Sequence, residues 1–202
     1  ASSLDMTSGT GVSGSVDYGL TASGFMGKVN FDRSGSGFLT INGADYTVIT
    51  SLGAAGSTTG TDLQGMSGNF SGKYFLGADI DASSTSTWNG NAGFAPVGDN
   101  TTKFSGVFEG GGHTISNLIV KSSRAGLFGY TAGAKIANVG LVGGSITGTN
   151  NTGGLVGYMD DGSITNSYNT GSVINSDANG ETYGGGLAGY IYSGSITNSY
   201  ST

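Results

Sequence analysis

The chain has 202 residues, of which 41 are glycine and none is cysteine, and its formal net charge is −6. The lack of cysteine excludes a disulfide framework, a thiolate metal site and a thiol nucleophile, and the absence of clustered basic residues argues against nucleic acid as a partner. No apolar run approaches the roughly 20 residues of a membrane span, yet recurring short apolar runs predict a core.

Residues 1–28 are predicted to form N-terminal strands, either the first rungs of a repeat or a preceding segment. Val16, Tyr18 and Leu20 alternate with Asp17 and Gly19, which is the period of a half-buried strand. These residues therefore favour a sheet before the repeat pattern becomes regular.

A hairpin is predicted next, because residues 38–41 and 46–49 are apolar runs on either side of Asn42-Gly43, a pair typical of tight turns. Asp62 is then expected to cap a single helical turn that carries Leu63 and Met66. No other helix is expected, because glycine and β-branched residues occupy every window.

Two strands are predicted within residues 70–80, followed by a long excursion over residues 83–94. Ile115 and Asn117 then introduce an Ile-x-Asn signature, 21 residues before the same pair at Ile136 and Asn138. This spacing indicates a rung of about 20 residues, and so on the order of eight or nine rungs.

Three copies of one motif dominate the second half of the chain: GLFGYTAGAKIANVG at 126–140, GLVGYMDDGSITNSY at 154–168 and GLAGYIYSGSITNSY at 186–200. In each copy isoleucine lies ten residues, and asparagine twelve residues, after the first glycine. Fixed spacing within the motif and variable spacing between motifs are typical of a coiled repeat, in which the extra residues leave as loops.

The motif predicts an all-β fold in which residues 29–202 form a single-stranded parallel β-helix, a solenoid with loop excursions. Stacked rungs would align like residues in columns, and asparagine amides would hydrogen-bond along the corner column. A flat antiparallel sandwich is the competing fold, although it does not require such fixed spacing. The predicted columns are Leu127, Leu155 and Leu187; Ile136, Ile164 and Ile196; and Asn138, Asn166 and Asn198.

The three GLxGY copies resemble the GLUG motif of bacterial surface proteins. The longer run from about residue 29 to 202, including LTINGADYTVITSLG, WNGNAGFAPVG and FEGGGHTISNLIV, is similar to filamentous-haemagglutinin-like adhesins. The resemblance implies a right-handed parallel β-helix, exported by two-partner secretion through an outer-membrane transporter. It also implies adhesion to host cells, surfaces or biofilm matrix, without catalytic residues. Similar GLUG segments occur beside some surface proteases, so the motif marks a scaffold.

Tyr130, Tyr158 and Tyr190 are predicted to form one column, with Tyr168 and Tyr200 in a second. An outward tyrosine column could stack against sugar rings, so the first three residues are candidate ligand-binding residues. The alternative is that the rings only stack on one another and cover glycine-rich backbone.

The candidate residues for other chemistry have plain structural interpretations as well. Asp79 and Asp81 share a strand face and could bind calcium, or they could cap a turn. His113 is the only histidine and is expected at a turn, while Asp160 and Asp161 are expected in a solvated turn. No cofactor is predicted.

The leading interpretation is a non-enzymatic, rigid segment of a longer secreted adhesin at the bacterial cell surface, with a host glycan or protein, or a matrix polysaccharide, as partner. A polysaccharide-binding or polysaccharide-degrading β-helix is the alternative, and an enzyme of this kind would require carboxylates that converge in one groove. An ice-binding face would require a regular threonine array, for which Thr147, Thr165 and Thr197 supply only one column.

Overall fold

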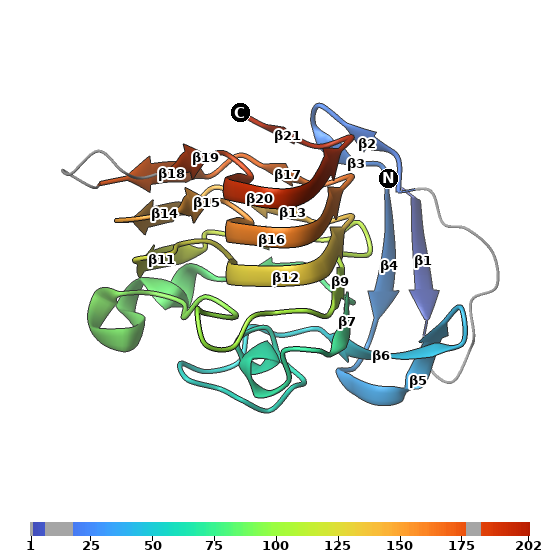
Figure 1. Cartoon of the computed structure of the whole chain (residues 1–202). Helices are drawn as coiled ribbons and strands as arrows, with labels where there is room; N and C mark the ends of the chain where they lie inside the picture. The colour runs from blue at the N-terminus through green and yellow to red at the C-terminus, as the bar shows by residue number, and fades with distance from the viewer. Residues whose placement is uncertain (1, 7–17, 177–182) are drawn as a thin grey trace.

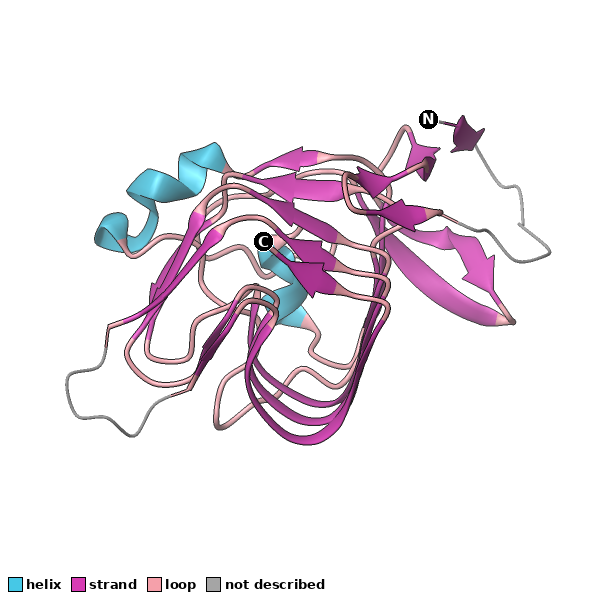
Figure 2. Cartoon of the chain, turned by 90° about the horizontal axis from the view of Figure 1, so that it is seen from above, coloured by secondary structure: helices cyan, strands magenta, loops and turns pink. Residues whose placement is uncertain are grey.

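The computed structural model describes residues 2–6, 18–176 and 183–202, and its main feature is a stack of parallel β-coils (Figure 1). The coils form a β-solenoid of about five turns, which confirms the predicted parallel β-helix. Viewed along the solenoid axis, successive coils superimpose on one another (Figure 2). Val16, predicted to lie in a strand, falls outside the described residues.

Three sheets run along the solenoid, and each coil contributes strands to them in turn. The largest sheet contains β5 (Gly35–Ile41), β6 (Ala44–Ile49), β7 (Lys73–Leu76), β9 (Val107–Glu109), β12 (Phe128–Ala137), β16 (Val156–Thr165) and β20 (Ala188–Thr197). The second contains β8 (Ile80–Asp81), β10 (Thr114–Ser116), β13 (Gly140–Val142), β17 (Tyr168–Asn169) and β21 (Tyr200–Ser201). The third contains β11 (Ile119–Ser122), β14 (Ser145–Gly148) and β18 (Ser172–Asn175). A short pair, β15 (Thr152–Gly153) and β19 (Gly184–Gly185), lies within the loop excursions.

Equivalent side chains of successive coils are paired in register, so the interior consists of columns. One column is filled by an aromatic residue in the early coils and by isoleucine in the later ones: Tyr74, Phe108, Ile136, Ile164 and Ile196. The predicted leucine positions are all buried, and the backbone amide of Leu155 donates to the carbonyl oxygen of Leu187 at 2.9 Å. Stacking of like residues therefore removes apolar surface from water coil by coil.

The predicted period of about 20 residues is wrong. Ile115 pairs with Leu141 in the second sheet, whereas Ile136 pairs with Phe108, which lies 28 residues before it. Paired residues of successive coils lie 26 to 35 positions apart, which leaves about five turns instead of eight or nine. The signature misled because Asn117 and Asn138 both have a positive φ, 58° and 57°, at different corners. The Ile-x-Asn signature therefore indicates the backbone conformation of a corner, and it does not indicate which corner of the coil the residues occupy.

The N-terminal half contains two short 3-10 helices, of which only one was expected. The first, η1 (Gln64–Gly68), begins where Asp62 Oδ1 accepts a 2.7 Å hydrogen bond from the Gly65 amide, as predicted. The second, η2 (Ser83–Asn91), contradicts the expectation of no other helix. There the Thr85 hydroxyl donates to the Ala82 carbonyl at 2.6 Å, a local bond that stabilises a tight turn in spite of poor helix propensity.

The stack of parallel strands begins at β6 and not at residue 29. The β5–β6 hairpin is antiparallel and turns at Asn42-Gly43, both with positive φ, as predicted. Ahead of it, β4 (Gly27–Phe31) pairs in parallel with β1 (Ser2–Met6), and β2 (Leu20–Thr21) pairs with β3 (Gly24–Phe25). These four strands lie outside the coils (Figure 1).

Candidate functional site: the tyrosine column and the coil corners

The three predicted ligand-binding tyrosines form a continuous stack along the largest sheet. The ring centroids of Tyr130 and Tyr158 are 4.4 Å apart, and those of Tyr158 and Tyr190 are 4.9 Å apart. The interplanar angles are 29° and 31°, so the rings lie nearly face to face. The register of β12, β16 and β20 places these residues directly above one another.

Both ends of the tyrosine column are covered as well. Lys103 Nζ lies 4.4 Å from the centroid of the Tyr130 ring, and the Tyr183 ring packs 4.9 Å from that of Tyr190. Because every ring has a neighbour on its faces, the stack does not offer an open aromatic face to a sugar ring. The ring edges and hydroxyl groups are what remain for a ligand.

Two cations accompany the tyrosine column. Lys103 forms a 3.1 Å ion pair with Asp160, and this hydrogen bond, with a smaller contribution from Tyr130, raises the pKa of Lys103. The Arg124 guanidinium lies 5.7 Å from the Tyr130 centroid and 5.9 Å from that of Tyr158. The column is therefore a mixed aromatic and charged surface on an otherwise acidic chain.

Asp160 and Asp161, predicted in a solvated turn, lie inside β16 and not in a loop, although Asp161 is exposed at a bend of that strand. Asp161 has a φ of 65°, and Gly133, Gly162 and Gly194 also have positive φ near the middle of their strands. These positions let the ten-residue strands turn a corner, and the register between β16 and β20 shifts there.

The asparagine positions build one corner of the solenoid. Asn138, Asn166 and Asn198 all have φ between 47° and 57°, the left-handed region that asparagine tolerates better than most residues. Asn166 Nδ2 donates to Asn138 Oδ1 at 3.3 Å, and Asn138 Nδ2 donates to Glu109 Oε1 at 2.9 Å. Glu109 thus continues the polar column in the preceding coil.

Glu109 is an acid that sequence reasoning did not single out. Burial raises its pKa and outweighs the opposing effect of hydrogen bonds from the Gly111 amide and Asn138. Its position follows from the register Glu109–Ala137, which sets it beside the Asn138 corner. The signal in the sequence would have been its distance from Asn138, 29 residues, which is close to the 28-residue coil.

Serine in the repeated Thr-Asn-Ser-Tyr segment has a specific role that was also missed. The Ser167 hydroxyl donates to the Thr165 carbonyl at 2.8 Å, and the Ser199 hydroxyl makes the equivalent bond to Thr197 at 2.9 Å. Each hydroxyl oxygen also lies within hydrogen-bond distance of an amide in the coil below: the Ser167 amide donates to Ser199 Oγ at 3.0 Å. Serine therefore satisfies polar groups at a corner where the ladder is interrupted.

The two aspartates considered for calcium are held by separate protein groups. Asp79 accepts from Lys28, from His113 Nδ1 at 3.1 Å and from the Thr114 amide at 2.9 Å. Asp81 accepts from Asn117 Nδ2 at 3.1 Å and from the Ser83 amide at 3.0 Å. Among the described residues no three acidic, histidine or cysteine side chains are grouped as they would be around a metal ion.

Asp79 and His113 connect the N-terminal strands to the solenoid. His113 is 1% exposed, and its Nε2 lies 2.8 Å from the Val29 carbonyl oxygen in β4. Both ring nitrogens therefore face oxygen atoms, one from each of the two parts of the chain. Burial acts to raise the pKa of Asp79, but hydrogen bonds from His113, Lys28 and the Thr114 amide together hold it below its ordinary value of 3.8.

The three threonines considered for an ice-binding face do not share a column. Thr165 and Thr197 are paired in the largest sheet, but Thr147 lies in β14 of the third sheet, next to Lys121 and Ile174. The arrangement of these residues therefore gives no flat threonine array.

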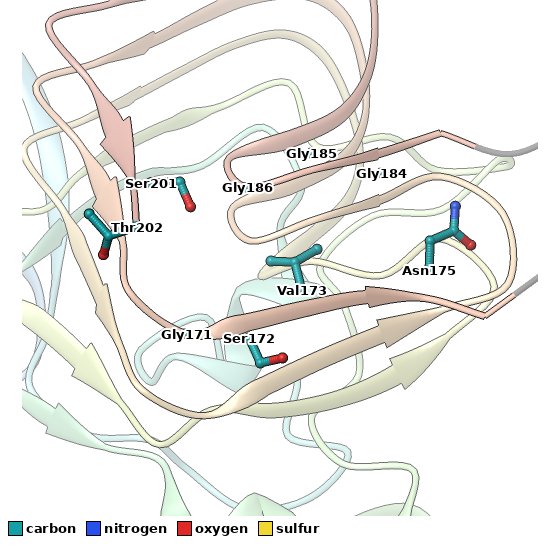
Figure 3. Close-up of a pocket in the computed structure, with 9 residues that line it drawn as sticks. All are labelled: Gly171, Ser172, Val173, Asn175, Gly184, Gly185, Gly186, Ser201 and Thr202. Carbon is teal, nitrogen blue, oxygen red and sulfur yellow. The ribbon is translucent and has the colours of Figure 1, made fainter.

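A cavity of about 470 Å³ lies at the C-terminal end of the solenoid (Figure 3). It is lined by backbone and small side chains of the last two coils: Gly171, Ser172, Val173, Asn175, Gly184, Gly185, Gly186, Ser201 and Thr202. No charged side chain lines it. In the coil below, Asn169 fills the position of Ser201 and bonds to the Gly186 carbonyl at 2.9 Å.

Comparison with known proteins identifies part of this architecture. The GLUG motif matches residues 148–174, which span the second motif copy and the strands around it. Halomucin from Haloquadratum walsbyi is 44% identical over 120 residues, which are 55% of this chain and 1% of halomucin. The chain therefore spans a very small part of this relative. No solved structure matches the chain, and no helix among the described residues has the length and apolarity to cross a membrane.

Proposed function

We propose that this chain is a structural segment of a long secreted or cell-surface protein, in which the solenoid spaces and displays neighbouring parts. The observation that carries this proposal is the continuous stack of parallel strands from β6 to β20. A stack of this kind resists bending, because each coil is hydrogen-bonded to its neighbours along the axis. The partial match to halomucin, a far longer protein, supports a segment role.

Attachment to a surface is the finer activity that we propose for this segment. The tyrosine column, with Lys103 and Arg124 beside it, offers phenol hydroxyls and two cations to a host glycan, a host protein or a matrix polysaccharide. Because the ring faces are covered, recognition would use hydrogen bonds with the phenol hydroxyls instead of stacking on a sugar.

The test separates binding through hydroxyl groups from a purely structural role of the column. In a triple variant, Tyr130, Tyr158 and Tyr190 are each replaced by phenylalanine, which keeps the stacked rings and removes the hydroxyls. The measurement is retention of fluorescent polysaccharides on beads coated with the chain. The matched control is Tyr192→Phe, because Tyr192 is 69% exposed and lies outside the column.

We expect the parent chain and Tyr192→Phe to retain the same polysaccharides and the triple variant to lose them, at unchanged thermal stability. Equal retention by the triple variant would remove the tyrosine column as the attachment surface. If the parent chain retained no polysaccharide and no host-cell glycan, the proposal of attachment would be contradicted. The proposal that the segment spaces and displays neighbouring parts would be unaffected.

A further inference from the structure

The last coil exposes side chains whose equivalents are buried in the coil below. Ile164 is fully buried, whereas Ile196, its partner in register, is 37% exposed. Met159 is 1% exposed, and its partner Ile191 is 41% exposed. At β20 the apolar interior of the solenoid is therefore exposed at the end of the stack.

The edge of β20 carries neither charge nor proline against further pairing, although its pairing with β16 contains a bulge. This strand is the last of the largest sheet and pairs with β16 on one side only. Its ten residues, AGYIYSGSIT, include no charged residue and no proline, the features with which natural edge strands prevent addition of another strand.

The opposite end of the solenoid is built differently. There the sheet ends in the antiparallel β5–β6 hairpin, and η1 places Met66 beside Leu63 in the interior, where both side chains are fully buried. The two ends therefore differ in kind: at this end the edge strand β5 runs antiparallel to the coils, whereas β20 and β21 run in the direction of the coils.

Two hollows lie at this open end. One is the 470 Å³ cavity of Figure 3, beside which Val173 continues the column of Val120 and Ile146 but is only half-buried. The other, of about 640 Å³, lies between residues 20–22 of the N-terminal strands and residues 198–200. The strands β2 and β3 stand beside β21 at this end (Figure 1), so they form a side wall for whatever covers it.

We propose that this end face binds a further parallel β-coil of the same repeat pattern, stacked in register on β20 and β21. Such a coil would place an apolar residue over Ile196 and another over Val173, and a tyrosine over Tyr200, which already stacks on Tyr168 at 5.3 Å and 9°. This inference rests on the proposed role as a structural segment and adds the way in which the segment is extended.

A second copy of the chain is the less suitable occupant. A copy stacked by its other end would place β5, which runs antiparallel to the coils, on β20, so no parallel ladder would form. Two open ends related by a two-fold axis would run their β20 strands antiparallel, and then no column of like side chains could continue. A coil that runs in the same direction as β20 satisfies both the ladder and the columns.

The experiment extends the complete chain by one coil. Residues 171–202 are repeated after Thr202, because 32 residues separate Ile164 from Ile196 and so make up one coil here. Amide hydrogen exchange of β20 is measured in the parent and extended chains, together with their sedimentation. Ile196→Lys is introduced into the extended chain, with Tyr192→Lys as control, because Tyr192 has no partner in the register with β16.

We expect exchange of the β20 amides to slow by at least about tenfold in the extended chain, because a new ladder would cover them. Tyr192→Lys should preserve this protection and Ile196→Lys should abolish it. Unchanged exchange in the extended chain would overturn the proposal. The proposal would also be overturned if the parent chain sedimented as a dimer and its β20 amides were already protected from exchange. That result would identify a second copy as the occupant. Neither result depends on whether the chain attaches to polysaccharides.

Discussion

Truncation of Ile164 tests whether the isoleucine column stabilises the solenoid. Ile164 is fully buried between Ile136 and Ile196. Replacement by alanine removes three carbon atoms, which corresponds to about 2.4 kcal/mol at about 0.8 kcal/mol per buried carbon. The cavity left between two coils should raise the loss to about 3–4 kcal/mol.

Ile196→Ala is the matched comparison, because it truncates the same residue type one coil higher. Ile196 is 37% exposed, so about two thirds of the transfer free energy is lost, roughly 1.5 kcal/mol, and no closed cavity forms. The assay is urea-induced unfolding followed by circular dichroism, combined with hydrogen exchange of β12, β16 and β20 to locate the loss. Equal losses in free energy of unfolding for the two variants would refute the assignment of Ile164 to a closed interior.

Three further predictions concern the corners and the junction with the N-terminal strands. Asn166→Ala should lower the free energy of unfolding by about 1 kcal/mol more than Asn166→Gly, measured by urea unfolding, because alanine is strained at a φ of 47° and glycine is not. The lowered pKa of Asp79 means that its contribution to stability is present above pH 3.8 and lost as the pH falls below it; thermal unfolding of Asp79→Asn should show a shallower acid dependence, and parallel curves would contradict this. The raised pKa of Glu109 has the opposite effect on stability. The contribution of Glu109 to the free energy of unfolding is present below pH 4.5 and is lost as the pH rises through the pKa that Glu109 has in the folded protein. Glu109→Gln should therefore flatten the loss of stability above pH 4.5 in the same assay, and a variant that keeps the parent's slope would argue against burial of this carboxyl group.

The repeat itself was enough to predict the winding of the chain. Ile164 and Ile196 occupy the same place in two copies of one motif, and parallel stacking is the arrangement that turns such identity into a buried column. The asparagine corners were also predictable, because Asn138 and Asn166 recur where the apolar alternation stops and asparagine tolerates positive φ.

The length of the coil was not predictable from the Ile-x-Asn signature. Ile115 and Asn117 carry the same signature as Ile136 and Asn138 but lie at a different corner of the coil. Local sequence specifies the turn, since the left-handed conformation is a property of one residue. Which turns are stacked depends on pairing between residues 26 or more positions apart, and a short motif cannot encode this pairing.

The sequence by itself thus determined that the chain coils, which side chains of the three motif copies form columns, and that asparagine turns a corner between them. Only the tertiary structure decided that the tyrosine faces are covered, that Glu109 continues the asparagine column, and that His113 connects the solenoid to β4. These features depend on loops and coils that meet in space without sharing a motif. Their physical reason is that register and burial are set by packing between coils, whereas strand and turn preferences are set within one coil.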